Sequence, residues 1–243
     1  LANEAGAERI GSADRVGGHE VTAVTARAGR ALRGRRRARL PGALIARLGG
    51  AKKIYGYRRN GRSILMSGGP LPLRENKRFI PRPMVDYYLE ICRWLNLAVP
   101  VRSRPRLFMS EAVQEKGRRL LKRYCISPDD TVIGINPGAQ FGSSKCWPPV
   151  HFARLAELIY RDWDCKILLF IGPGEEDIGR EIVELSQAKI INTGPDKIDL
   201  ALLKPLIRRC QLLFTNDTGP RHYAVAFNIP VVVIMGPTDP RYT

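Results

Sequence analysis

A short polar segment, Asn-Asp-Thr-Gly at residues 216–219, separates an apolar run from a helical pattern that begins at Pro220. Free backbone N–H groups and the helix dipole make such a place favourable for a phosphate group, and glycine lets the backbone approach it closely. The hydroxyl of Thr218 adds a donor. Capping of the helix by Asp217 or Thr218 is the alternative role. His222 can donate to a phosphate or a sugar hydroxyl, or can simply pack against the loop.

Three charged residues elsewhere suit the same kind of ligand. Lys145 follows the glycine- and serine-rich GAQFGSSK and precedes a helical pattern, where its ammonium suits a diphosphate, although most lysines are merely exposed. Glu175 and Glu176 follow FIGPG, and a carboxylate just past a strand end can bind a ribose diol. A first-turn glutamate that stabilises the next helix is the alternative. The three histidines lie far apart in sequence, so we expect no metal site.

The second half of the chain alternates apolar runs with helical patterns. Strands are predicted at 131–135, 166–172, 189–194, 211–216 and 229–236, and helices at 147–163, 179–188, 199–210 and 220–228. This alternation indicates right-handed βαβ units and a parallel sheet covered on both faces. Ligands of such sheets bind outside the carboxyl ends of the strands. The polar loops at 136–145, 172–177, 215–219 and 236–239 are therefore predicted to form one cleft.

The first half has a weaker pattern. Helices are predicted within residues 82–98 and 110–126, the second capped by Ser110. Residues 52–73 hold an Asn-Gly pair between short apolar runs, which predicts two short strands around a turn. Residues 1–40 are rich in Ala, Gly and Arg without a clear period, and no secondary structure is predicted for them.

Composition limits the class of protein. The 243 residues are 44% hydrophobic, enough for one large or two modest cores, and no apolar run approaches the ~20 residues of a membrane span. We find no secretory signal, and the five scattered cysteines suggest reduced thiols in a cytosolic setting. Residues 1–130 hold 28 Lys and Arg against 11 Asp and Glu, whereas residues 131–243 hold 12 of each. The first half is therefore expected to meet an anionic partner, unless its charge only solvates the surface.

The motifs around these residues resemble a known family. TNDTGPRHYAVAFNIPVVVIMGPTDP is similar to the donor-site region of glycosyltransferase family 9, the ADP-heptose:lipopolysaccharide heptosyltransferases. GINPGAQFGSSKCWPPVHFARLAELI resembles that family's phosphate loop and the helix after it. GAKKIYGYRRNGRSILM and FIPRPMVDYYLEICRWLNL are similar to the end of the acceptor domain in the heptosyltransferase II branch. The likeness covers roughly residues 41–243.

The resemblance implies an α/β fold of the GT-B type, with two Rossmann-like domains, and a metal-independent, inverting transfer of heptose to the lipopolysaccharide inner core. It implies that Lys145 binds the ADP phosphates, that Thr218 and Gly219 hold the diphosphate, and that Asp217 contacts the heptose hydroxyls. His222 would support that loop, and Glu176 best matches the ribose-binding glutamate, with Glu175 as the alternative. The donor is ADP-heptose, no cofactor is expected, and the acceptor is a phosphorylated lipopolysaccharide core. Acceptor-binding residues are expected among four arginines of the acceptor segment, namely Arg58, Arg59, Arg62 and Arg82.

The sequence also departs from the family pattern. Residues 1–40 lack the opening strand and the Gly-Asp loop that carries the family's general base, and Asp14 has no strand before it. The catalytic base is therefore unassigned, and we expect an atypical segment at 1–40, a partial acceptor domain at 41–126 and a donor domain at 127–243. The expected location is the cytoplasm, with possible peripheral contact with the inner membrane. One alternative is a transferase of the same fold that uses a different sugar or acceptor. The other is a basic nucleic-acid-binding module on a degenerate nucleotide fold, although we expect no nucleic acid partner.

Overall fold

The computed structural model describes residues 42–59, 61–101, 103–138 and 146–242. The chain divides into two compact units, and the second begins at Pro100. The sequence placed this division after residue 126, so the structure assigns residues 103–126 to the second unit instead. The predictions made for residues 1–40, including the position of Asp14, lie outside the described residues.

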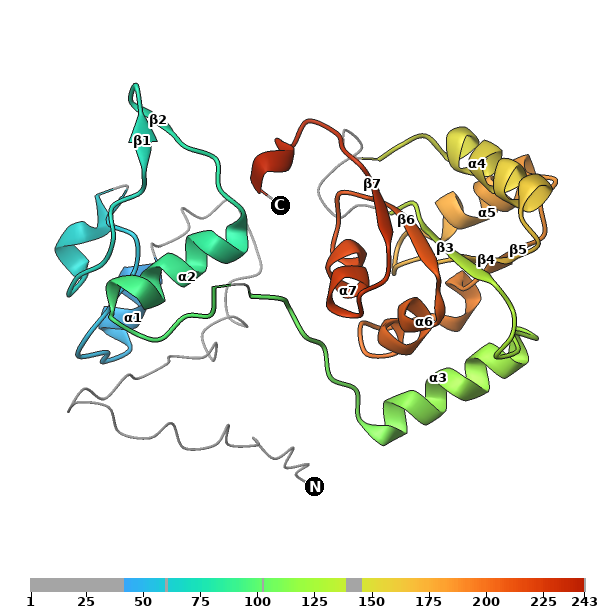
Figure 1. The fold of residues 1–243 in the computed structure, drawn as a ribbon, viewed down its shortest axis with the longest axis horizontal. Coiled ribbons are helices and arrows are strands. Elements are labelled where there is room, and N and C mark those ends of the chain that lie inside the picture. The colour runs from blue at the N-terminus through green and yellow to red at the C-terminus, as the bar shows by residue number, and fades with distance from the viewer. Residues whose placement is uncertain (1–41, 60, 102, 139–145, 243) are drawn as a thin grey trace. The chain divides into compact units, whose positions relative to one another are not determined.

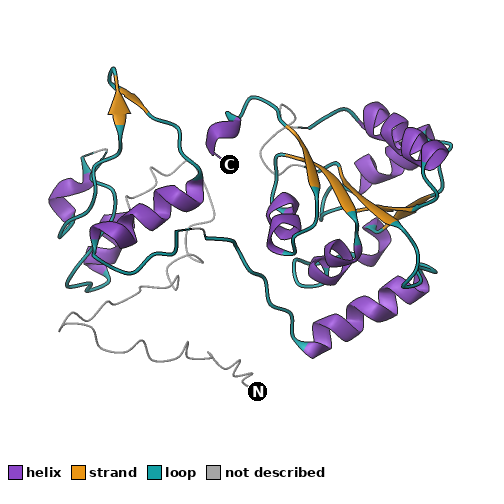
Figure 2. Ribbon diagram, in the orientation of Figure 1, coloured by secondary structure: helices purple, strands orange, loops and turns teal. Residues whose placement is uncertain are grey.

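A five-stranded parallel sheet forms the centre of the second unit, with helices on both of its faces (Figures 1 and 2). Its strands are β3 (Val132–Asn136), β4 (Lys166–Leu169), β5 (Ile190–Asn192), β6 (Leu212–Asn216) and β7 (Val231–Ile234). The order across the sheet is β5-β4-β3-β6-β7, so the chain moves outward in one direction and then in the other from β3. Ile133 of β3 pairs with Ile167 of β4 and Leu212 of β6. All five predicted strands are therefore confirmed, and their carboxyl ends lie at one edge.

The helices of this unit are α3 (Glu111–Arg123), α4 (Pro149–Asp162), α5 (Glu176–Leu185), α6 (Leu203–Arg209) and α7 (Pro220–Ala226), with short 3-10 turns at Gly194–Asp196 and Pro240–Tyr242. Alternate residues of the central strands point to opposite faces, which creates two apolar clusters. Val132 and Leu213 pack with side chains of α3, α6 and α7. Ile133 and Ile167 pack with side chains of α4 and α5 on the other face. This double cover explains why the strands read as continuous apolar runs.

Helix α3 belongs to the second unit because it packs closely on α6. A Cβ atom on Gly117 would lie 2.5 Å from the ring carbons of Pro205, so only glycine allows this approach. The hydroxyl of Tyr124 donates to Asp196, and Lys204 Nζ donates to the carbonyl of Phe108 at 3.1 Å. Pro205 lies in the first turn of α6, where its missing N–H removes no intrahelical bond.

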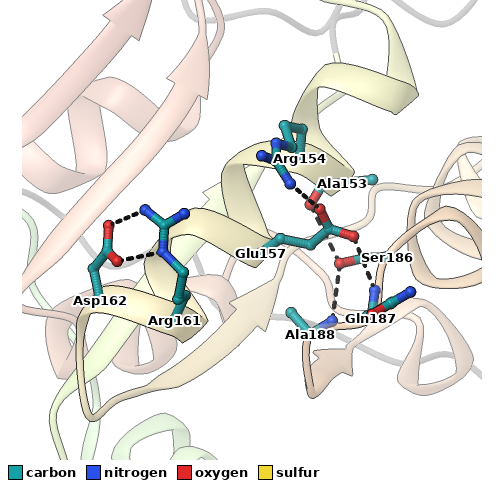
Figure 3. Close-up of polar contacts among 8 residues, drawn as sticks. All are labelled: Ala153, Arg154, Glu157, Arg161, Asp162, Ser186, Gln187 and Ala188. Carbon is teal, nitrogen blue, oxygen red and sulfur yellow. Dashed lines mark hydrogen bonds and ion pairs between the residues drawn. The ribbon is translucent and has the colours of Figure 1, made fainter.

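Polar contacts join α4 to the segment that leads from α5 into β5 (Figure 3). Glu157 accepts hydrogen bonds from the backbone N–H of Gln187 at 3.2 Å and from Arg154 at 2.9 Å. These two donors hold the pKa of the Glu157 carboxyl below its usual value. Ser186 donates to the carbonyl of Ala153 at 3.2 Å. These contacts fix α4 against the segment that follows α5 on one face of the sheet.

The first unit holds α1 (Gly42–Leu48), a 3-10 helix at Arg62–Leu65, β1 (Arg74–Glu75), β2 (Arg78–Phe79) and α2 (Met84–Trp94). The prediction of two strands around residues 60–61 is wrong: a 3-10 helix follows Gly61, and only a single parallel bridge joins Tyr55 to Gly68. Side chains hold this irregular segment on α2, since Tyr57 donates to the carbonyl of Tyr87 at 2.7 Å and stacks on its ring. Within the described residues of this unit, the only sheet is the antiparallel pair β1–β2.

None of the helices in the described parts of the chain combines the length and the apolar character that crossing a membrane requires.

Candidate functional site

Three polar side chains are buried where β3 and β6 end. Asn136, Thr215 and Asn216 are all less than a tenth exposed. The Asn136 amide donates to the Thr215 hydroxyl at 3.2 Å, and that hydroxyl donates to the carbonyl of Asn216 at 2.9 Å. Buried polar groups are costly unless they are paired, and here they are paired with each other. They fix the backbone at the centre of the carboxyl edge.

Asn216 also holds the loop that follows β3. Its Nδ2 group donates to the carbonyl of Pro137 at 2.6 Å, and its Oδ1 atom accepts from the backbone N–H of Trp147 at 3.3 Å. The ring of Trp147 then packs on His151 and Phe152 at the start of α4. Both ends of the predicted phosphate loop are therefore attached to β6. Lys145, predicted to bind phosphate from this loop, lies outside the described residues.

A cavity of about 410 Å³ opens at this edge of the sheet. Its polar lining includes Asn136, Thr193 and Asp199, together with residues of the loops predicted to form a cleft. Its apolar lining includes Phe170, Ile171, Ile198, Leu200 and Leu203. A concave, mostly apolar space with a few polar groups is the usual character of a small-molecule site. The described parts of three of the four predicted loops contribute to it, and the loop at 236–239 is not among the lining residues.

Glu175 is the glutamate that lines this cavity. Its carboxylate accepts a hydrogen bond from the backbone N–H of Gly172 at 3.0 Å, and it lies so close to Gly138 that a Cβ atom there would be 1.9 Å from Oε2. Glu176 begins α5, is exposed and does not line the cavity. The structure therefore places at the cavity the residue that the sequence held as the alternative, and Glu176 has the position of a helix-stabilising first-turn acid.

The loop before α7 contributes Thr218 and Gly219 to the cavity wall, as predicted from the sequence, whereas Asp217 is turned into a buried ion pair. Its Oδ1 atom lies 2.7 Å from Nη1 of Arg221, one helical turn later, and both side chains are largely buried. Thr218 and Gly219 are thus exposed to a ligand at the end of β6. Asp217 is not among the residues that line the cavity.

His222 is joined to the same ion pair. Arg221 Nε donates to His222 Nε2 at 3.2 Å. The histidine side chain is partly exposed, but burial of the rest of the ring lowers its pKa below the ordinary value. The Arg221 guanidinium lowers the pKa further, and the Asp217 carboxylate opposes this effect. His222 therefore favours its neutral form at neutral pH.

The four arginines predicted to bind the acceptor have different surroundings in the first unit. Arg59 and Arg62 line a cavity of about 380 Å³ together with tyrosines 55, 57, 87 and 88. The Arg59 guanidinium lies over the Tyr87 ring, 5.6 Å from its centroid, and its Nε atom is buried without a hydrogen bond to any described residue. Arg82 lies 3.6 Å from Glu90, and Arg58 is exposed. Binding of the acceptor by some of these arginines stays a prediction.

Within the residues that the structure describes, no group of three or more His, Cys, Asp and Glu side chains is placed to hold a metal ion.

Comparison with known proteins identifies the family. Residues 37–243 match the model of glycosyltransferase family 9 (heptosyltransferase). The chain belongs to glycosyltransferase family 9. This family 9 chain is 31% identical over 205 residues to lipooligosaccharide heptosyltransferase 2 of Haemophilus influenzae, covering 77% of this chain and 55% of that protein. It is 35% identical over 126 residues to lipopolysaccharide heptosyltransferase 2 of Escherichia coli, covering 50% of this chain and 35% of that one.

Solved structures agree with this family 9 assignment. The crystal structure of the glycosyl transferase family 9 from Veillonella parvula superposes with a TM-score of 0.71 at 25% identity, covering 82% of this chain and 55% of that one. The structure of Escherichia coli ADP-heptose lps heptosyltransferase II gives a TM-score of 0.64 at 27% identity, covering 83% and 61%. These likenesses confirm the predicted α/β fold class of the GT-B type. The chain spans about half the length of the first curated relative and less of the second.

Sequence reasoning missed several residues of this family 9 site. Leu200 and Leu203 of the apolar wall fall within the predicted helix at 199–210 and Ile198 directly precedes it, but the sequence assigned them no role in binding. Asn136 and Asn216 were placed in the polar loops without a structural role, although an asparagine at the last position of two neighbouring strands is a signal for a buried polar contact. Arg221 follows Asp217 by four residues in a helix, a spacing that brings side chains together and could have indicated the ion pair.

Proposed function

We propose that this protein transfers heptose from ADP-L-glycero-D-manno-heptose to the inner core of lipopolysaccharide. The observation that carries the proposal is the cavity at the carboxyl edge of a family 9 sheet, lined by Glu175, Thr218 and Gly219. The printed names of the relatives, heptosyltransferases of lipopolysaccharide and lipooligosaccharide, supply the sugar and the class of acceptor. A nucleic-acid-binding module is not favoured, because the match to family 9 extends over the basic first unit.

Three regions of the cavity suit the base, the ribose and the phosphates of a nucleoside diphosphate. Its apolar wall of Ile198, Leu200 and Leu203 offers a surface for a flat base. The Glu175 carboxylate is placed to accept hydrogen bonds from a ribose diol. Thr218 and Gly219 offer a hydroxyl and closely approachable backbone to the phosphates, and Lys145 would add the positive charge. The family resemblance implies that Asp217 contacts the heptose hydroxyls, from the ion pair with Arg221 beside the cavity.

The proposed reaction is a displacement at the anomeric carbon. A hydroxyl of the acceptor attacks this carbon while the bond from the carbon to the diphosphate oxygen breaks, so the configuration inverts and ADP leaves. Lys145, Thr218 and Gly219 would stabilise the charge that develops on the diphosphate, which makes a metal ion unnecessary. The proton of the acceptor hydroxyl passes to a general base, for which the described residues offer no assignment.

The acceptor side rests on the basic first unit. A phosphorylated core would meet arginines such as Arg59 and Arg62, which line a cavity with several tyrosines. Arginine is well suited to this role because its planar guanidinium binds phosphate through two parallel hydrogen bonds. The acceptor is a glycolipid, so the proposed place of action is the cytoplasmic face of the inner membrane.

The donor and the whole reaction are tested separately. Calorimetry with ADP is expected to show saturable binding, and its absence would contradict the donor site. Mass spectrometry of a defined core acceptor incubated with ADP-heptose is expected to show the gain of one heptose. If ADP binds but only another nucleotide sugar is used, the fold and donor site stand while the proposed sugar is wrong.

A further inference from the structure

The start of α7 and the loop before it hold a connected set of three charged or titratable side chains, Asp217, Arg221 and His222. Arg221 Nη1 lies 2.7 Å from Asp217 Oδ1, with the two side chains 13% and 5% exposed. Arg221 Nε donates to His222 Nε2 at 3.2 Å. One guanidinium therefore contacts both Asp217, which the family resemblance places at the heptose hydroxyls, and His222, which it implies supports the loop, and it does so next to the Thr218–Gly219 wall of the cavity.

This geometry determines the proton positions on His222. The Nε atom of a guanidinium always carries a hydrogen, because arginine stays protonated in proteins. His222 Nε2 must therefore accept, which requires a neutral imidazole with its single proton on Nδ1. The remaining Nδ1–H group can only donate. A doubly protonated imidazole would place an N–H group against the Nε–H group of Arg221.

Among the described residues, the charged groups on neighbouring segments include Asp199, which accepts from the backbone N–H of Leu202 at 2.7 Å, and Lys204, Arg208 and Arg209 of α6. Strands β6 and β7 carry no titratable side chain. In α6, Lys204 donates to the carbonyl of Phe108, and Arg209 donates to three carbonyls before β3. The groups that act electrostatically on His222 are Arg221, which disfavours its cationic form, and Asp217, which favours it.

We propose that Arg221 is a positioning residue of the donor site, which holds the Asp217 carboxylate in one orientation and holds His222 as a neutral Nδ1–H donor. This inference rests on the proposed function, since it assigns the pair to a bound nucleotide sugar. A carboxylate and a neutral N–H group side by side can accept from and donate to hydroxyl groups of a sugar without adding net positive charge. Arg221 would thus act through its two neighbours.

The first test is an NMR titration of the full chain labelled with ¹⁵N at histidine, with His222→Gln to assign the signal. Arg221→Met is expected to raise the pKa of His222 by about half a pH unit or more, because a nearby cation is removed while Asp217 remains. Asp217→Asn is expected to lower it. Arg221→Lys keeps the charge but loses the Nε donor, so it should retain the low pKa and give mixed imidazole tautomers. If Arg221→Met leaves both the pKa and the Nδ1–H tautomer unchanged, the proposal is wrong.

The second test measures the affinity for ADP-heptose by calorimetry between pH 5 and 8, because the proposed partners of Asp217 and His222 are hydroxyl groups of the sugar. In Arg221→Met the pH at which affinity changes is expected to move upward together with the NMR pKa, which a purely structural role would not produce. Should Arg221→Met fail to fold, Arg221→Lys and Asp217→Asn still decide the proposal through the tautomer and the pKa. Failure of the wild-type chain to bind ADP would contradict the proposed function, whereas an unmoved His222 titration would contradict only the role of Arg221.

Discussion

The side-chain Oδ1 atom of Asn216 accepts a hydrogen bond from the backbone N–H of Trp147 at 3.3 Å. The Nδ2 group of the same side chain donates to the carbonyl of Pro137 at 2.6 Å. One fully buried amide at the end of β6 therefore holds both ends of the segment that contains Lys145. The neighbouring strand β6 thus holds Pro137 and Trp147, on either side of this loop.

Asn216→Ala is expected to lower the free energy of unfolding by about 1–3 kcal/mol, because the carbonyl of Pro137 and the N–H of Trp147 lose their partners inside the protein. The affinity for ADP should fall by about tenfold or more, since groups that position a ligand lose their support. Chemical denaturation and calorimetry measure the two effects. The matched control is Gln187→Ala, whose exposed side chain should change stability by less than about 0.5 kcal/mol. A variant as stable and as tightly binding as the wild type would show that the loop is held by other contacts.

The two adjacent glutamates provide a sharper test of the donor site. Glu175→Ala is expected to weaken ADP binding by about 10–100-fold, because a charge-assisted hydrogen bond contributes about 1.5–3 kcal/mol. Glu176→Ala should change the affinity by less than about twofold, since the side chain is exposed outside the cavity and contributes only to the helix dipole. Calorimetry with ADP measures the affinity of both variants and shows which glutamate binds the nucleotide. If Glu176→Ala weakened ADP binding more than Glu175→Ala did, the ribose contact would be assigned to Glu176 instead.

The contact between Gly117 and Pro205 predicts a loss of stability without a loss of binding. In Gly117→Ala the new methyl group would meet the proline ring at 2.5 Å, and overpacking of this kind costs about 1–3 kcal/mol. The higher helix propensity of alanine offsets up to ~1 kcal/mol of this cost. We expect a lower midpoint of urea unfolding, with unchanged ADP affinity below the transition because α3 does not line the cavity. Lys116→Ala, an exposed neighbour in the same helix, is the control. An unchanged midpoint for Gly117→Ala would mean that α6 shifts away from the new methyl group without loss of stability.

Much of the second unit could be predicted because its strands are buried on both faces. Such strands appear as apolar runs that glycine- and proline-rich loops interrupt, and parallel pairing then places their ends at one edge. The position of the cavity followed from this rule. The choice between Glu175 and Glu176 did not, because adjacent residues at a helix start point in directions about 100° apart and only the backbone geometry selects one.

The first unit was harder to predict because its order comes from side chains. The segment around Gly61 is held by the hydrogen bond from Arg62 to the carbonyl of Tyr57 and by the stacking of Tyr57 on Tyr87. Neither contact leaves a periodic pattern, so the Asn-Gly pair suggested a hairpin that does not form. The division between the units was misplaced for a related reason, since the fit of Gly117 on Pro205 is specified by shape and not by hydrophobic spacing.

The surroundings of the arginines predict which of them binds the acceptor. The buried Nε atom of Arg59 lacks a hydrogen bond to any described residue, so a phosphate oxygen would supply a partner that the unit itself does not. Arg82 is already paired with Glu90 at 3.6 Å, and such partly exposed pairs contribute little. Arg59→Ala is therefore expected to weaken binding of a phosphorylated core acceptor by about 10–100-fold, whereas Arg82→Ala should weaken it by less than about threefold. Calorimetry with the phosphorylated and the dephosphorylated acceptor measures this, and ADP affinity should stay constant in both variants. Equal losses in the two variants would mean that the acceptor responds to the general positive charge of the unit and not to the Nε donor of Arg59.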